Sequence, residues 1–126
     1  DVSLDNYYYS PNRKKVALEV ITPDSKRSYV GVQEIKVLDL LTLKRKTIIS
    51  SVRWSNFYWK DDKTISFFVP DGNYVGYYKD VNIGLPGLFT FNDKIWNGED
   101  VSGWTKVSSA EMETIQNRLA KINKGY

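Results

Sequence analysis

Two segments 49 residues apart share one plan, and this plan constrains the fold more than any other feature of the chain. The segments YSPNRKKVALEV (9–20) and YWKDDKTISFFV (58–69) each hold an aromatic residue, a polar turn with lysine, and a hydrophobic run. A polar turn followed by such a run is typical of one β-strand leaving a tight turn. The sequence therefore predicts two copies of a turn-plus-strand unit.

The hydrophobic runs alternate with a period of two, as β-strands do. In the first run one face carries Val16, Leu18 and Val20, and the other carries Ala17, Glu19 and Ile21. In the next predicted strand, Ile35 and Val37 are expected to face inward. Pro70, Asp71 and Gly72 then supply a fixed φ, a capping side chain and a residue that tolerates positive φ, so we expect a hairpin there.

The C-terminal segment has the pattern of one amphipathic helix. Ser108 and Glu111 have the spacing of a capping box, and Val107 and Met112 have the spacing of a hydrophobic staple. An apolar stripe follows at intervals of three and four residues, and it consists of Met112, Ile115, Leu119 and Ile122. The pattern predicts a helix from about Ser109 to Lys124.

A chain of 126 residues is the length of a single domain. We expect an α+β fold, mainly an antiparallel meander or small sandwich of about six to eight strands, with the C-terminal helix packed on one side. The β-rich part is expected over 1–106 and the helix over about 109–124.

The two matching segments resemble the blade repeat of TolB-type β-propellers, whose pattern is an aromatic residue, Ser-Pro-Asp-Gly-Lys and a strand that begins with Ile or Val. The first segment keeps Ser10, Pro11, Lys14 and Val16. The resemblance covers about 60 residues in two pieces, and it implies a propeller fragment or a small relative whose helix covers an open face. Arg13 and Asp62 stand where the family has glycine.

Those two departures matter for the turns, because Arg and Asp adopt positive φ less readily than glycine does. The family's turn geometry is therefore not expected to carry over unchanged to Arg13 and Asp62.

The chain contains neither histidine nor cysteine. This excludes Ser-His-Asp and Cys-His nucleophile systems and the zinc sites built on those ligands. The carboxylate pairs Asp61 with Asp62 and Glu99 with Asp100 are read as turn residues. We therefore expect no enzyme activity, no catalytic residues, no cofactor and no metal site.

The net charge of +3 is a mild excess, whereas nucleic-acid binders usually show a concentrated basic face. The runs Arg13–Lys15 and Lys44–Lys46 are read as solvated turns and guarded strand edges, with an acidic or phosphate partner as the alternative. We expect no nucleic-acid binding, and no segment is apolar enough to cross a membrane.

Aromatic residues are the remaining functional signal. In a strand Tyr7 and Tyr9 share a face while Tyr8 takes the other, so at least one of the three is expected to face solvent. Exposed Tyr and Trp are typical of protein interfaces and sugar-binding platforms. The loop-rich segment from Ile83 to Trp104 is the expected contact surface, and the candidate partner-binding residues are Trp96, Trp104, Phe89, Phe91 and Tyr77.

Absence of catalytic groups and a surplus of Tyr and Trp together favour a noncatalytic binding or protein-interaction module. The composition favours an exported bacterial domain, while a cytoplasmic location stays open. Two alternatives remain: a toxin-neutralising immunity or inhibitor protein, and a carbohydrate-binding module. The sequence identifies neither the partner nor the oligomeric state.

Overall fold

The described part of the chain folds into two antiparallel sheets and one helix, an α+β arrangement. The computed structural model describes residues 3–24, 27–51, 55–84 and 103–124, with side chains described for 7–21, 33–50, 55–84 and 103–123. The elements are β1 (Ser3–Tyr9), β2 (Lys15–Asp24), β3 (Arg27–Asp39), β4 (Arg45–Ser51), β5 (Asn56–Asp61), β6 (Thr64–Asp71), β7 (Val75–Asn82), β8 (Thr105–Ser108) and α1 (Ser109–Lys124).

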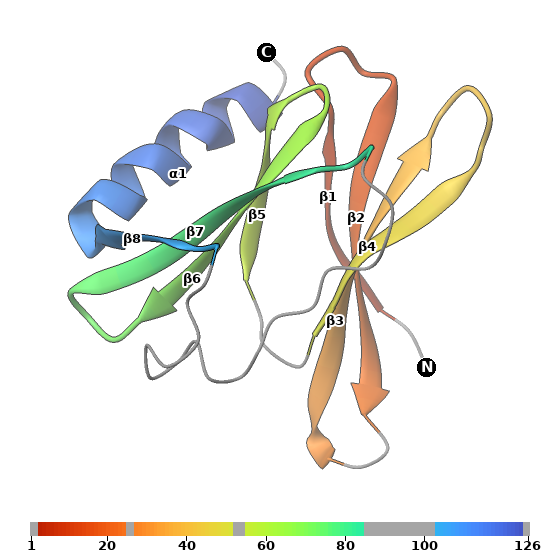
Figure 1. Ribbon diagram of the computed structural model, residues 1–126. Coiled ribbons are helices and arrows are strands. Elements are labelled where there is room, and N and C mark those ends of the chain that lie inside the picture. The colour runs from red at the N-terminus through yellow and green to blue at the C-terminus, as the bar shows by residue number, and fades with distance from the viewer. Residues whose placement is uncertain (1–2, 25–26, 52–54, 85–102, 125–126) are drawn as a thin grey trace.

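Each sheet is a meander of four strands in chain order, β1–β4 in sheet 1 and β5–β8 in sheet 2. Figure 1 shows three layers, with sheet 2 between α1 on one side and sheet 1 on the other. The expected hairpin at Gly72 is confirmed, since β6 pairs with β7 from Asp71 opposite Val75 and Gly72 has a φ of 76°. In the described part, no helix is long and apolar enough to cross a bilayer.

The largest core cluster lies between the two sheets. Its buried members are Ala17, Ile35, Val37, Ile48 and Ile49 from sheet 1 and Phe57, Trp59, Ile65 and Phe67 from sheet 2. The inward orientation expected for Ile35 and Val37 is confirmed. Their burial removes apolar surface from water and holds the two sheets together.

Polar contacts add a second link between the sheets. Buried Gln33 donates from Nε2 to Glu19 and to the Ser55 carbonyl, and its Oε1 accepts from the Ser55 amide. Tyr8 lies nearby and packs edge-on against Phe57 at 5.2 Å. Burial raises the pKa of Tyr8, and the charges of Tyr58 and Glu19 raise it further.

Helix α1 covers the far side of sheet 2. The second buried cluster contains Phe68, Val107, Met112 and Leu119. The expected helix bounds are confirmed, and the Ser108 hydroxyl accepts from the Glu111 amide at 3.1 Å as an N-cap.

The prediction that Ile122 ends the apolar stripe of the helix is wrong. Ile122 is exposed, and Asn123 is buried in its place. Asn123 bonds the backbone of Trp59 on the edge strand β5, which accounts for a polar residue facing the sheet. The helix pattern identified the stripe but had no information about an open strand edge beneath its last turn.

The turn after the first strand of each sheet holds the same side-chain bond in the two repeated segments. Asn12 Oδ1 accepts from the Lys14 amide at 3.0 Å, and Asp61 Oδ1 accepts from the Lys63 amide at 2.8 Å. These are the same side-chain-to-backbone bond at matching positions of the two copies. The expectation about positive φ is wrong for Arg13, which has a φ of 65°, and holds for Asp62, which is not among the described non-glycine residues with positive φ.

Further bonds repeat where the third strand of each sheet ends. The Leu40 amide donates to the Lys14 carbonyl at 3.0 Å, and the Ile83 amide donates to the Lys63 carbonyl at 2.9 Å. The two sheets therefore share these two hydrogen bonds as well as their meander strand order.

The copies stack head to tail. Val16 and Ile65 hold equivalent places in the second strand of each sheet. Val16 pairs with Tyr9 on one side and Leu38 on the other. Ile65 pairs with Trp59 on one side and Val81 on the other. Ile65 faces sheet 1 and belongs to the core between the sheets, whereas Val16 lies on the side of sheet 1 away from sheet 2. The face of sheet 2 that carries Ile65 thus packs on sheet 1, whereas the corresponding face of sheet 1, which carries Val16, points away from sheet 2.

Candidate interaction surface

Head-to-tail stacking leaves one sheet face without a covering layer, and we call it the open face. It is the side of sheet 1 that points away from sheet 2. By register its described members include Tyr7 and Tyr9 from β1, Val16, Leu18 and Val20 from β2, Glu34, Lys36 and Leu38 from β3, and Arg45 and Thr47 from β4. Val16 is buried, at 5% exposed, and the others are half-buried or exposed. None of the three core clusters formed by described residues includes one of these side chains, and no described element covers this side in Figure 1.

Two tyrosines form a ridge along the edge of the open face. Tyr7 is 58% exposed and Tyr9 is 39% exposed, and their rings meet edge to face with centroids 6.2 Å apart. The Arg13 guanidinium lies 5.6 Å from the centre of the Tyr9 ring. These contacts restrict the rings before any partner arrives, which lowers the entropy that binding would cost.

The strand beside the ridge turns its more apolar face outward. On the open face Leu18 and Val20 are half-buried and Val16 is buried, while the opposite face of β2 carries buried Ala17 and Glu19 and half-buried Ile21. A strand with one covered face usually directs its larger apolar residues to the covered side. The reversed pattern in β2 is typical of a face that acquires a covering layer.

Polar side chains border this apolar area on the side of β3 and β4. Lys36 Nζ donates to Thr47 Oγ1 at 2.8 Å and lies 3.9 Å from a carboxylate oxygen of Glu34. An apolar centre with a polar rim is the usual anatomy of a protein interface.

Two cavities lined by described residues are small. A polar cavity of about 30 Å³ lies beside Tyr8, Glu19 and Tyr58, and a cavity of about 90 Å³ lies between sheet 2 and α1 beside Asp80 and Arg118. Ligand pockets usually span about 300 to 1,000 Å³. Both cavities suit a few water molecules, so an extended surface is the better candidate for binding.

The residues expected at the contact surface fall in different places. Phe89, Phe91 and Trp96 lie outside the described residues. Tyr77 is buried and packs with Val69, and half-buried Trp104 packs against that pair and against the core between the sheets. The role of these five residues in partner binding stays a prediction.

The sequence pointed to the tyrosine ridge but missed the face to which it belongs. The expectation that at least one residue of the Tyr7–Tyr9 run faces solvent is confirmed, and it holds for Tyr7 and Tyr9 while Tyr8 turns inward. The apolar residues of β2 carried the missing signal, because alternation identifies two faces without deciding which one is covered.

Comparison of the chain with protein-family models, with curated proteins and with solved structures finds no match.

Proposed function

We propose that this chain is a noncatalytic protein-interaction module that docks its partner on the open face of sheet 1. The observation that carries the proposal is the exposed Tyr7 and Tyr9 ridge on the one stacking face that no described element covers. Tyrosine is enriched at the centres of protein interfaces, where its ring buries apolar area and its hydroxyl bonds a partner.

The other layers of the fold indicate what kind of partner would fit. The matching face of sheet 2 is covered by the apolar inner face of sheet 1, and the far side of sheet 2 is covered by the apolar stripe of α1. The partner would accordingly present an apolar sheet or helix face. Kinship with TolB-type propellers, also a proposal, would favour a four-stranded sheet in this place.

The proposed setting is an exported bacterial protein. The basis is the composition, with nine tyrosines, four tryptophans and no cysteine in 126 residues.

Site-specific photo-crosslinking tests the docking face. A photoreactive phenylalanine analogue replaces Tyr7 in one variant and Tyr74 in a control variant, in cells that make the protein. Tyr74 is a suitable control because it is also a tyrosine and is 83% exposed, but it lies in the β6–β7 turn of sheet 2. We expect a discrete protein adduct from position 7 and none from position 74, and the reverse pattern would reject the open face.

A further inference from the structure

A second exposed apolar feature lies outside the open face, in the turn between β3 and β4. This turn, Leu40–Lys44, is called the leucine tip. Leu41 is 91% exposed and Leu43 is 71% exposed, and Leu40 is exposed as well. Exposed leucines scattered singly are common, but three in one five-residue turn form an apolar patch on a part of the chain that is usually polar.

The leucine tip is held in one shape by its own hydrogen bonds. Asp39 Oδ1 accepts from the amides of Leu41 and Thr42 at 2.9 and 3.0 Å, and the Leu43 amide donates to the Asp39 carbonyl at 2.8 Å. Leu43 has a φ of 61°, in the left-handed region that favours glycine. Leu43 combines a strained backbone with an exposed side chain, and strain of this kind clusters at functional positions, which points to a role in contact with something else.

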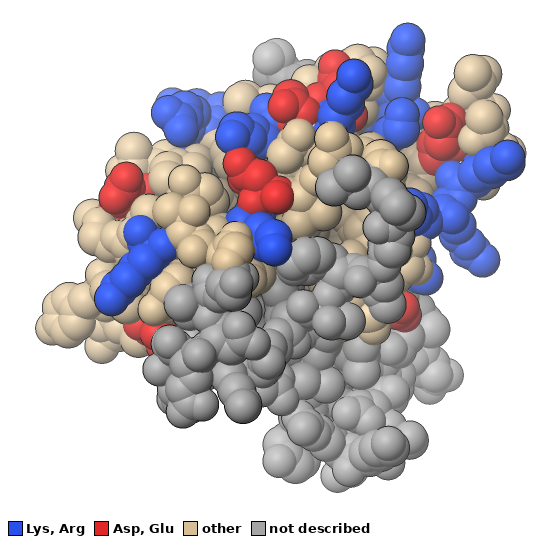
Figure 2. Space-filling view, in the orientation of Figure 1, with Lys and Arg blue, Asp and Glu red and all other residues tan. Residues whose placement is uncertain are grey.

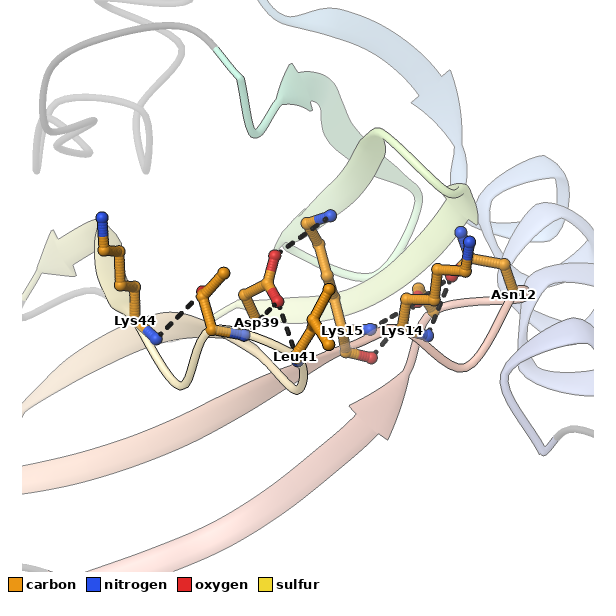
Figure 3. Close-up of polar contacts among 8 residues, drawn as sticks. Asn12, Lys14, Lys15, Asp39, Leu41 and Lys44 are labelled. Carbon is orange, nitrogen blue, oxygen red and sulfur yellow. Dashed lines mark hydrogen bonds and ion pairs between the residues drawn. The ribbon is translucent and has the colours of Figure 1, made fainter.

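Cationic residues of two adjoining turns lie beside the leucine tip, and we call them the cationic collar. The β1–β2 turn lies beside the tip, because the Leu40 amide donates to the Lys14 carbonyl, and Figure 3 shows Lys14, Lys15, Asp39, Leu41 and Lys44 together at these two turns. The collar consists of Arg13, Lys14, Lys15, Lys44 and Arg45.

The local charge of the two turns is clearly positive. Five cations stand against one carboxylate in residues 10–15 and 39–45. That carboxylate, Asp39, already accepts two backbone amides and lies 3.9 Å from Lys15 Nζ. The next turn, β5–β6, adds the Asp62 carboxylate, which is occupied by the Asn12 amide at 2.7 Å. In Figure 2 basic side chains, with acidic ones among them, lie along the upper edge of the molecule.

We propose that the leucine tip docks this chain on an anionic lipid surface. Leu41 and Leu43 enter the boundary between head groups and acyl chains, while the lysine and arginine heads of the collar remain at the level of the lipid phosphates. Attraction between the collar and the anionic head groups brings the tip to the surface.

The composition of the tip distinguishes a bilayer from a protein partner. Protein hot spots are enriched in Trp, Tyr and Arg, with leucine under-represented, and interfaces are depleted in lysine. The tip combines leucine with lysine on a convex turn, which needs no matching pocket when the partner is a lipid layer. The open face, with its exposed tyrosines, has instead the composition that is typical of a protein interface.

Vesicle sedimentation of the full chain tests the proposal. The probes are vesicles of phosphatidylcholine alone and of phosphatidylcholine mixed with phosphatidylglycerol. We expect binding to the anionic vesicles, weakened at least tenfold by Leu41→Ser with Leu43→Ser and by Lys14→Glu with Lys44→Glu, and weakened by high salt. Tyr74→Ser, the matched loss of an exposed apolar side chain on another turn, should leave binding unchanged.

Fluorescence separates insertion from surface attraction. The chain has no cysteine, so Leu41→Cys and Tyr74→Cys each give one labelling site for a polarity-sensitive dye. The dye at position 41 should shift to shorter wavelength with anionic vesicles, and the dye at position 74 should not. Circular dichroism of each variant confirms that it is folded.

Four results would overturn the proposal. They are no binding of the wild-type chain to anionic vesicles, equal binding to neutral and anionic vesicles, equal shifts at positions 41 and 74, and full vesicle binding by the Leu41→Ser, Leu43→Ser variant. If the collar binds polyglutamate beads while the vesicles stay free, the leucine tip is a site for an acidic protein instead.

Discussion

Asn123 near the end of α1 pairs with the backbone of Trp59 on the edge strand β5. Its Oδ1 accepts from the Trp59 amide at 2.7 Å, and its Nδ2 donates to the Trp59 carbonyl at 2.9 Å. Because β5 is the first strand of sheet 2, these groups have no neighbouring strand on that side. One side chain thus closes an exposed sheet edge and fastens the helix to it.

Replacing Asn123 with Ala should lower the free energy of unfolding by about 1 to 3 kcal/mol, since the buried backbone groups of Trp59 lose their partner. Asn117→Ala is the matched control, because Asn117 is exposed on the same helix, and its effect should stay within about 0.5 kcal/mol. Urea titration of both variants checks this. Equal effects would mean that Asn123 does not support the edge of β5.

The sequence predicted the parts of this fold that are set by local patterns. The helix bounds, the N-cap at Ser108 and the hairpin at Gly72 follow from spacing and turn chemistry alone, and all three are observed. Asn123 could not be assigned in this way, because the groups it bonds lie 64 residues earlier in the chain. The helical period predicted that Ile122 is buried, but hydrogen bonds to Trp59 bury its neighbour Asn123 instead.

The candidate sites depended still more on tertiary structure. The exposure of the Tyr7–Tyr9 run was predicted from strand alternation, but the open face depends on which side sheet 2 covers. The run Lys44–Lys46 was read as a solvated turn, and the leucines that precede it were overlooked. A turn that reads DLLTLK departs from the polar composition of most turns, and this departure was the available signal.

Leu43→Gly should raise the free energy of unfolding by up to about 1 kcal/mol, because glycine relieves the strain of a φ of 61° and little packing is lost. Leu41→Gly is the control in the same turn, and it should be neutral or destabilising because Leu41 has no such strain. Thermal and urea unfolding compare the two. A loss of stability in Leu43→Gly larger than in Leu41→Gly would show that the Leu43 side chain packs in the fold.

Gly76 on β7 provides a test of how closely α1 packs on sheet 2. A Cβ at this position would overlap the sulfur of Met112. Gly76→Ala should therefore cost about 1 kcal/mol of stability, the low end for overpacking, because the atoms that must move are the flexible end of the Met112 side chain. In a Met112→Ala background the same change should cost less, and a double-mutant cycle measures the difference. A coupling of zero would place Met112 away from Gly76.

The acid limb of the stability curve should depend on the two turn carboxylates. Hydrogen bonds from the amides of Thr42 and Leu41 lower the pKa of Asp39, and one from the Lys63 amide lowers the pKa of Asp61. Each group then binds protons more readily in the unfolded chain, so its contribution is present above the ordinary value of 3.8 and is lost as the pH falls through the lower folded value.

Asp39→Asn with Asp61→Asn keeps the acceptor oxygens but removes the titration. The double variant should show a flatter fall in urea midpoint between about pH 5 and pH 2 than the wild-type chain. Parallel curves for the two proteins would contradict the assignment of these carboxylates.

Affinity for the partner captured at position 7 tests the docking role of the open face most directly. Titration calorimetry with that partner should show that Tyr7→Ala weakens binding by about 2 kcal/mol, roughly 30-fold, as truncation of an interface hot spot does. Stability should change by no more than about 0.5 kcal/mol, because Tyr7 is 58% exposed. Tyr74→Ala should bind as the wild-type chain does. Equal affinity of the Tyr7→Ala and wild-type chains would contradict docking on the open face.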